Sequence, residues 1–519
     1  MVSDSAPRQL QPGSPVYESD LGPVMQAEPL SWEAALRVVS PEGKEISLPG
    51  FADGERWRVR LNATPGTWQW RTTNGASGTL TVPPSTTRWP VAPLRLSENR
   101  HFLTSGGAPF YFFADTAWSI VWKGRPEEWA IYLDRRAAQG FSVLQVNLLP
   151  WRWETTDIEG NRPFHDGDPS RPNPAYFRRY DEFLAMASER GLRVCLMLIW
   201  GGPRPLLPAV HFSTDQAVAF ARYAVARFAA FPMLWSISGD AEYVEELWKW
   251  DAVGMAVDET DPYAHPTTNH LPPRMNWHAL HHLATWHDFH MLQTGHTRGA
   301  IAELADLPTF YHHLEPTKAV VNGEPWYEAH PAMDQPGTYG PVFTPDLVRY
   351  AFWVSVLSGA TMGHTYGSQG IWNWKRPGDS EEHQAGPQIG PLWTAALDHL
   401  GAAQCARGVG LLKTLPWWEL RPAPERVQMD PAPGIYHRPF CAIATDRAWV
   451  VYLPEGKGQA ILKGVSPGAW RARWFDPRTG EEREIAPVEP DPNHKWRAPA
   501  APTSDDWVIV LDRLHAREG

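Results

Sequence analysis

The sequence predicts an α/β fold, a (β/α)8 TIM barrel flanked by two all-β sandwich domains. The first observation is that residues 91–412 alternate apolar strand-like runs with helix-like runs, in eight successive units. The second is that the segments on either side consist of short alternating strands punctuated by turn residues. The third is the length of 519 residues, which exceeds one typical domain and allows a large core.

The first segment, residues 1–90, is predicted to form a β-sandwich. Its strand-like runs are ALRVVS, RWRVRLN, TWQWRTT and SGTLTV, and turn signals such as PEGK and NGASG separate them. Short strands at this spacing are typical of an antiparallel sandwich. The Pro-rich link VPPSTTRWPVAP follows and separates this domain from the barrel.

The barrel is predicted from the order of its eight strand-like runs. They are FYFFADTAW, FSVLQVNLLPW, LRVCLMLIWGG, PMLWSISGDAEY, HPTTNHLPP, DFHMLQTGH, KAVVNGEPWYE and TMGHTYG. The fifth run is the weakest, and a poor helix follows it. A doubly wound open sheet is the alternative, but no Gly-rich phosphate loop follows the first run.

The last segment, residues 413–519, is predicted to be a second all-β domain. The runs AIATDRAWVVYLP, GAWRARWFDP and DDWVIVLDR have the alternation expected of strands. A segment of this length is a sensible domain size.

The bulk composition excludes several classes of partner. A formal net charge of -11 disfavours nucleic acid, whose phosphates require clustered Lys and Arg. No apolar run approaches the roughly 18 residues of a membrane span. The first residues, MVSDSAPRQLQPGSP, lack the features of a signal peptide, so we expect a cytoplasmic protein unless a leader has been removed. The sequence indicates no oligomeric state.

Cysteine and histidine spacing gives no sign of a metal or cofactor. Cys195, Cys405 and Cys441 are far apart, which fits a reducing compartment and no disulfide framework. His287 and His290 in WHDFH allow a metal-dependent hydrolase as an alternative, but no HExxH or zinc-finger spacing accompanies them. We therefore expect neither a metal site nor a cofactor.

The ends of the predicted strands carry polar and aromatic residues. In a TIM barrel the active site lies at the C-terminal ends of the strands. Aromatic rings can lie on the apolar C–H face of a sugar, although many of the 28 tryptophans will belong to the core. For Asp115, capping of the next helix is an equal alternative. The predicted substrate-binding residues are Asp115, Trp118, Asn147, Trp151, Trp153, Asn269, His270, His290, Trp326, Tyr327, His364, Tyr366 and Trp372.

Two carboxylates are predicted to be catalytic. Asp240 closes the fourth run, LWSISGD, and Glu324 closes the seventh, VVNGE. Because these two strand ends face each other across a barrel mouth, the pair can perform glycoside hydrolysis. One group attacks or stabilises the anomeric carbon, and the other protonates the leaving oxygen. The ionised partner raises the pKa of the proton donor.

Five motifs together resemble the apiosidase-like glycoside hydrolases of the large retaining (β/α)8 superfamily. In order they are FFADTAW, VLQVNLLPW, WSISGD, NGEPWYE and GHTYG. The segment FADGERWRVRLNATPGTWQWRTT resembles the small β-sandwich that often precedes that barrel. The tail, from WWELRPAPERV to WFDPRTGEE, resembles a C-terminal sandwich labelled collagen-binding in that family. The resemblance implies that Glu324 is the nucleophile and Asp240 the acid/base.

One position departs from the wider superfamily. That superfamily usually has Asn-Glu at the end of the fourth strand, where this chain has Gly239-Asp240. The apiosidase-like branch shares the Asp, and Glu242 is a possible substitute. The sequence therefore predicts a retaining glycosidase that acts on a carbohydrate substrate. A non-catalytic carbohydrate-binding protein on the same scaffold and the metal-dependent hydrolase are the alternatives.

Overall fold

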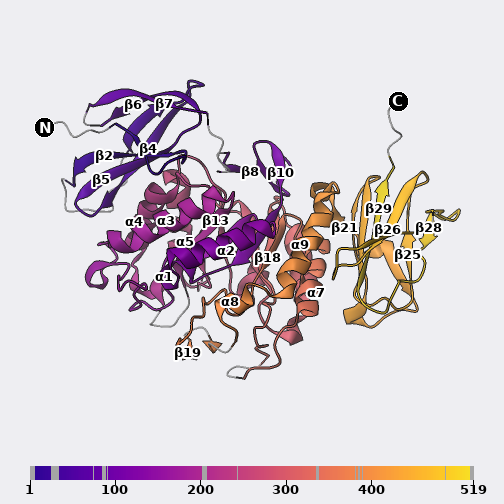
Figure 1. Cartoon of the computed structure of the whole chain (residues 1–519). Helices are drawn as coiled ribbons and strands as arrows, with labels where there is room; N and C mark the ends of the chain where they lie inside the picture. Colours follow the sequence, from indigo (N-terminus) through magenta and orange to yellow (C-terminus); the bar gives the residue numbers. More distant parts are fainter. Residues whose placement is uncertain are drawn as a thin grey trace.

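A computed structural model gives the architecture of the chain. The structure describes residues 6–24, 34–73, 75–84, 89, 92–201, 207–241, 243–334, 338–379, 382–383, 386–387, 390–485 and 487–514. Figure 1 shows a central α/β body with one β domain at each end of the chain. The predicted fold class is confirmed. The division of the chain after residues 90 and 412 stays a prediction.

Eight parallel strands close into a barrel in sequence order, since β18 pairs with β11. All eight lie within the runs expected from the sequence, so these runs are correctly predicted. The strands are β11 (Phe112–Thr116), β12 (Val143–Asn147), β13 (Arg193–Trp200), β14 (Met233–Gly239), β15 (Thr267–His270), β16 (Phe289–Gln293), β17 (Ala319–Glu324) and β18 (Gly363–Tyr366).

Helices follow the strands and cover the barrel. They begin where caps favour them: Ser213 forms a capping box with Gln216 at the start of α4. Proline occupies the first turn of α2, α3 and α7. The helices are α1 (Ile120–Lys123), α2 (Pro126–Ala138), α3 (Pro174–Glu189), α4 (Thr214–Phe228), α5 (Leu247–Thr260), α6 (Glu303–His312), α7 (Pro345–Leu357), α8 (Trp393–Ala396) and α9 (Leu400–Lys413).

The fifth unit has no α-helix among its described residues. Only the short 3-10 helix η3 (Pro273–His278) lies between β15 and β16. The other 3-10 helices in the barrel region are η1 (His165–Gly167), η2 (Pro208–His211) and η4 (Arg298–Ala300). The poor helical pattern of the fifth unit is thus a correct prediction.

One side chain identifies which residues face the barrel interior. The Gln145 side-chain amide donates to the Gly323 carbonyl oxygen at 3.0 Å and to Thr365 Oγ1 at 2.9 Å. These residues belong to β12, β17 and β18, and a side chain reaches across to β17 only through the interior. Successive residues of a strand point to opposite faces. The neighbours of Thr365, namely His364 and Tyr366, therefore face the surrounding helices.

The N-terminal domain is one antiparallel sheet folded on itself. Its order is β1-β2-β5-β4-β3-β6-β7. The first half of β4 pairs with β3, and its second half pairs with β5. Val38, Val59, Leu61 and Trp68 share a buried cluster, so the two halves pack face to face. The strands are β1 (Arg8–Gln9), β2 (Val16–Pro23), β3 (Ala34–Val39), β4 (Glu45–Asp53), β5 (Arg56–Asn62), β6 (Gly66–Thr72) and β7 (Ser77–Val82).

The C-terminal domain contains a six-stranded and a three-stranded sheet, in the orders β21-β23-β24-β29-β26-β27 and β22-β25-β28. A cluster that includes Trp449, Trp474, Trp496 and Trp507 fills the space between them. The strands are β21 (Arg421–Pro422), β22 (Val427–Asp430), β23 (Phe440–Ala444), β24 (Ala448–Leu453), β25 (Gln459–Lys463), β26 (Trp470–Phe475), β27 (Glu482–Glu484), β28 (Lys495–Arg497) and β29 (Trp507–Arg513). The 3-10 helices η5 (Trp417–Glu419), η6 (Pro424–Arg426) and η7 (Ile435–His437) accompany them.

Short elements complete the chain. The hairpin strands β8 (Leu94–Leu96), β9 (Leu103–Ser105) and β10 (Ala108–Phe110) precede the barrel, and β19 (Glu382–His383) pairs with β20 (Gly386–Pro387) after it. The three cysteines are buried and free. Among the described residues, no helix is both long enough and apolar enough to cross a membrane.

Buried ion pairs join both end domains to the barrel. Arg60 of β5 contacts Asp181 of α3 at 2.6 Å, and Arg227 of α4 contacts Asp53 of β4 at 3.1 Å. At the other end, Arg349 of α7 forms two hydrogen bonds of 2.7 and 2.8 Å with Asp506. Both end domains are therefore held by specific contacts as well as by the chain.

Candidate active site

Asp240 and Glu324 lie at the C-terminal ends of β14 and β17. Glu324 is the last residue of β17 and is only 7% exposed. Asp240 follows β14 directly, and its side chain is 33% exposed. Its φ of 50° lies in the left-handed region, which is uncommon for a residue other than glycine. The backbone thus turns sharply at the point where the carboxylate is presented.

A single imidazole lies between the two carboxylates. His270 Nδ1 is 3.4 Å from Asp240 Oδ1, and His270 Nε2 is 3.3 Å from Glu324 Oε2. The ring is fully buried, and neither approach has hydrogen-bond geometry. Two acidic groups from different strands therefore converge on opposite ends of one side chain.

A second histidine contacts the other oxygen of Glu324. His296 Nε2 lies 3.1 Å from Glu324 Oε1. The His296 ring stacks on His330 with centroids 4.2 Å apart, and it packs against Tyr327 at 4.5 Å. The sequence prediction missed His296 and His330. His296 ends the sixth run, DFHMLQTGH, so its position at a strand end was a usable signal.

The surroundings shift the pKa values of the two carboxylates in opposite directions. Burial alone would raise the pKa of Glu324, but the contacts from His270 and His296 lower it well below its usual value. Burial raises the pKa of Asp240 against the lowering effect of His270, and the charge of Glu324 acts in the same direction as burial. Burial lowers the pKa of His270, but Asp240 and Glu324 raise it to about 9. Glu324 is thus the more acidic carboxylate, and His270 is a cation at neutral pH.

Aromatic rings border the acidic pair. Trp118 and Trp200 contact the His270 ring at centroid distances of 5.8 and 5.7 Å and lie 5.3 Å from each other. Trp151 contacts Trp200 at 6.2 Å and Trp372 at 5.3 Å. Of these rings, Trp118, Trp151 and Trp372 are predicted site residues that the structure brings together.

One of these aromatic residues, Trp200, was not among the predicted site residues. Trp200 ends β13, and its ring lies against the backbone of Gly239, where an added Cβ would be 2.3 Å from Trp200 Cζ3. Only glycine fits beneath this ring. The sequence contains the relevant signal, since Trp200 is a strand-terminal aromatic residue like the others.

Asn147 lies on the barrel side of β12, and Tyr327 lies in the loop that follows β17. Asn147 is two residues after Gln145, so it shares the inward face, and its buried amide has no hydrogen-bond partner among the described residues. The Tyr327 hydroxyl donates to Thr116 Oγ1 at 3.2 Å. Both side chains are buried, at 1% and 2% exposure.

Several predicted residues are engaged elsewhere. Asp115 is fully buried and accepts hydrogen bonds from Tyr132 and Arg136 of α2, at 2.7 and 2.6 Å. Trp153 lies further out, stacked on His211 with centroids 4.6 Å apart. Neither side chain contacts the acidic pair.

The remaining predicted residues face the helices or loops outside the barrel. Their partners are close: Asn269 with His281 at 3.0 Å, His290 with His282 at 3.0 Å, His364 with Phe352 at 5.2 Å between centroids, Tyr366 with Glu328 at 2.7 Å, and Trp326 with the Thr297 carbonyl oxygen at 3.3 Å. The structure does not bring these five to the pair. Glu242 lies outside the described residues.

The histidines named for a metal site lie in a different cluster. His287 and His290 have ring centroids 4.9 Å apart. Within the described ranges, no group of three or more His, Cys, Asp or Glu side chains has an arrangement that could hold a metal ion.

Comparison with known proteins gives two family matches. The model described as "Apiosidase-like, catalytic domain" matches residues 97–419. The model described as "Putative collagen-binding domain of a collagenase" matches residues 435–512. No curated protein matches the chain.

Solved structures share the fold. One described as a glycoside hydrolase has a TM-score of 0.70 at 22% identity and covers 81% of this chain and 97% of its own. A glycoside hydrolase family 5 structure from Bacteroides vulgatus has a TM-score of 0.72 at 22% identity and covers 83% and 95%. A further structure from that bacterium covers 96% and 98% with a TM-score of 0.72 at 16% identity. At these identities the likeness shows the fold alone.

The first family match includes every barrel strand and both carboxylates, and it spans more than half of the chain. The chain therefore belongs to the apiosidase-like glycoside hydrolases.

Proposed function

We propose that the protein cleaves a glycosidic bond by a retaining double displacement, with Glu324 as nucleophile and Asp240 as acid/base. The observation that carries this proposal is the convergence of Asp240 and Glu324 on opposite ends of His270. Retention requires two carboxyl groups close together, about 5–5.5 Å apart, whereas inversion leaves room for a water between them at about 6.5–9.5 Å. Membership of the apiosidase-like family, which resembles the retaining (β/α)8 enzymes, favours retention, and the anomer of the first product decides between the two outcomes.

The two carboxylates have the ionisation that this chemistry needs. The depressed pKa of Glu324 keeps it an anion, which can attack the anomeric carbon. The raised pKa of Asp240 favours its protonated form, which can donate to the leaving oxygen. Attack forms a glycosyl ester at Glu324 and releases the alcohol. Asp240 then takes a proton from water, the water oxygen attacks the anomeric carbon, and Glu324 is released as a carboxylate.

The two histidines stabilise the nucleophile in its charged form. His270 and His296 contact different oxygens of Glu324, so both oxygens have a nitrogen partner. The tryptophan rings beside His270 are 2% and 8% exposed and pack on His270 and on each other, so they shield the acidic pair from water. Asn147 and Tyr327 offer hydrogen bonds to the hydroxyl groups of a sugar. The family description reads "Apiosidase-like", so an aryl apioside belongs in a substrate array beside common hexosides and pentosides.

Two isosteric substitutions test the assignment. Glu324→Gln is expected to abolish turnover on every aryl glycoside, because the amide cannot attack. Asp240→Asn is expected to lose roughly 10²–10⁴-fold on a poor leaving group, and far less on dinitrophenolate, which leaves without a proton. Proton NMR of the first product formed by the wild type is expected to show the anomer of the substrate.

Carboxylates on α6 provide matched controls. Glu303→Gln and Asp306→Asn remove the same atoms outside the site, and both variants are expected to keep full activity. Full activity in Glu324→Gln, or an inverted first product, contradicts the proposal. Binding of array sugars without any release favours the non-catalytic alternative.

A further inference from the structure

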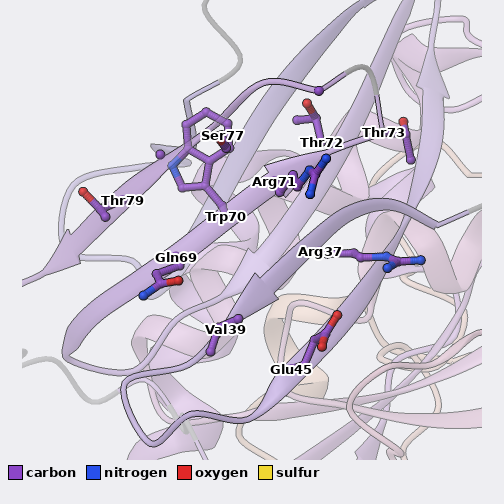
Figure 2. Close-up of a pocket in the computed structure, with 12 residues that line it drawn as sticks. Arg37, Val39, Glu45, Gln69, Trp70, Arg71, Thr72, Thr73, Ser77 and Thr79 are labelled. Atoms are coloured by element: carbon purple, nitrogen blue, oxygen red, sulfur yellow. The ribbon is translucent and has the colours of Figure 1, made fainter.

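The N-terminal sheet carries a groove on its outer face. It has a volume of about 790 Å³, and Figure 2 shows that strands β3, β4, β6 and β7 line it. Burial alternates along β6, with Gln69 and Arg71 exposed and Trp68 and Trp70 facing the core. The groove therefore lies on the solvent side of a sheet whose other side is a packed core.

Two arginines are cross-strand neighbours in the groove. Arg37 of β3 and Arg71 of β6 are directly paired in the antiparallel register, so they lie on the same face. Directly opposite residues have Cβ atoms about 4.5–5.5 Å apart, and like charges at this distance destabilise a sheet. Both side chains are exposed, and neither forms an ion pair with a residue in the described part of the chain. Glu45, on the same face of β4, lies diagonal to Arg37 and forms no ion pair with either arginine among the described residues.

Uncharged hydrogen-bonding side chains on β7 lie beside the arginines on the same face of the sheet. Ser77 pairs with Arg71, and Thr79 pairs with Gln69, on the edge strand β7. Glu45 lies at the opposite border, beside Val39. The whole chain has a net charge of -11, so the two adjacent cations are a local departure from an acidic protein. A groove of this composition suits a polyhydroxylated anion.

We propose that this groove binds a carboxylate-bearing polysaccharide. Arginine forms bidentate hydrogen bonds with carboxylates, so Arg37 and Arg71 would each hold an acidic group of the polymer. Gln69, Ser77 and Thr79 would bind hydroxyl groups. In Figure 1, β4 and β5 lie toward α3 and α4, and β6 and β7 lie on the far layer. The groove is lined by residues between Arg37 and Thr79, so it shares no residue with the acidic pair. Polymer held here would be concentrated near the barrel.

Affinity electrophoresis of the full chain tests the proposal with two cellulose derivatives. Carboxymethylcellulose carries carboxylates, and hydroxyethylcellulose is a neutral polymer on the same backbone. The wild type is expected to be retarded by the first and not by the second. Arg37→Gln/Arg71→Gln is expected to weaken retardation at least tenfold, and either single change several-fold. Added salt is expected to weaken wild-type retardation.

A charge-matched double variant provides the control. Lys457→Gln/Arg497→Gln removes two exposed cations of the C-terminal domain and is expected to behave as the wild type. Absence of wild-type retardation, equal retardation by the neutral polymer, or undiminished retardation in the Arg37/Arg71 variant overturns the proposal. The last result would assign binding to another surface of the protein. Turnover of small aryl glycosides is expected to be unchanged in both variants, so a failure of the proposed catalysis is seen independently.

Discussion

At the scale of single residues, His270 is the feature that organises the site. It is a buried cation between two acids, and together with His296 it holds the pKa of Glu324 below its usual value. An enzyme that needs an ionised nucleophile loses activity when the nucleophile is protonated. With Glu324 as the proposed nucleophile, the acid limb of the pH profile depends on these two contacts.

His270→Asn is expected to shift the acid limb of kcat/KM to higher pH, because the pKa of Glu324 rises when the neighbouring cation is removed. A fall in kcat of roughly 10²-fold is expected as well. The measurement is the pH dependence of kcat/KM, which reports groups of the free enzyme. His313→Asn, on the exposed end of α6, provides the control and should leave the profile in place. A variant whose kcat/KM is lower at every pH, with no shift of the acid limb, would contradict the role of His270 in lowering the pKa of Glu324.

Strand periodicity explains which site residues the sequence could predict. Asp240, Glu324 and His270 were correctly located at strand ends, and the structure brings them together. His290, His364 and other strand-end residues face the helices instead. Alternate residues of a strand point into the barrel. Which alternate set points inward depends on the register of each strand and on bulges, such as the one between β16 and β17. One sequence gives no register, so the inward set could not be derived from it.

At the scale of elements, the end of β14 depends on a close approach. Trp200 of β13 packs against Gly239, and Asp240 follows in a left-handed conformation. The backbone conformation at Gly239-Asp240 therefore depends on its packing against the Trp200 indole. From this position the carboxylate of Asp240 lies 3.4 Å from His270.

Gly239→Ala is expected to destabilise the fold by about 1–3 kcal/mol, because its Cβ would overlap the Trp200 ring. Displacement of Asp240 should also reduce turnover on poor leaving groups. Urea unfolding and aryl glycoside assays give the two readouts. Gly410→Ala in α9 is the matched control, since nothing lies within 4 Å of the added carbon. It should stabilise the helix by about 0.5–1 kcal/mol. Equal effects of the two changes would contradict the packing argument.

The buried histidines beside β16 predict a loss of stability in acid. Burial lowers the pKa of His287 and of His290 well below the usual value, and neighbouring charges act in the same direction. In the unfolded chain these groups titrate near pH 6.5. The unfolded state therefore binds more protons below that pH, and stability falls as pH falls. His270 has the opposite sign: its pKa of about 9 means that its contribution is complete below about 6.5 and is lost as pH rises through 9.

His287→Phe is expected to reduce the acid-side loss by up to about 1.4 kcal/mol per pH unit below pH 6.5. The ring is retained, and neither His287 nitrogen has a hydrogen-bond partner among the described residues. Urea midpoints of wild type and variant at pH 5, 6.5 and 8 measure the effect. Parallel curves at all three pH values would show that His287 does not contribute.

At the scale of the whole molecule, the three parts are joined by ion pairs that water scarcely reaches. Arg349 and Asp506 have side chains only 6% and 7% exposed. Gln404 also accepts from Arg349, at 2.6 Å, and Tyr452 donates to Asp506 at 3.1 Å. Removal of one partner from such a pair leaves a buried charge without compensation.

Arg349→Met is expected to destabilise the protein by about 3–5 kcal/mol and to expose the junction between barrel and C-terminal domain to protease. The double variant Arg349→Met/Asp506→Asn should recover much of that loss, because no charge remains unpaired. Thermal unfolding and limited proteolysis report the two effects. A double variant as unstable as the single one would assign the loss to packing.

The overall architecture was more predictable than the site. Apolar runs such as LRVCLMLIWGG fix the barrel strands by composition and length alone, and each lies where the pattern places it. The pairing of Arg60 with Asp181, or of Arg349 with Asp506, joins residues more than a hundred positions apart. No local pattern encodes such pairings, so the way the domains join could not be derived from the sequence.

Strand β4 begins at Glu45, on the border of the outer groove, and ends at Asp53. Asp53 forms ion pairs with Arg178 and Arg227 of the barrel helices. One extended stretch of backbone thus spans both layers of the N-terminal domain. A force applied to a ligand bound in the groove would therefore be transmitted along the backbone of β4 to the barrel helices, and would not depend on the packing between the two layers.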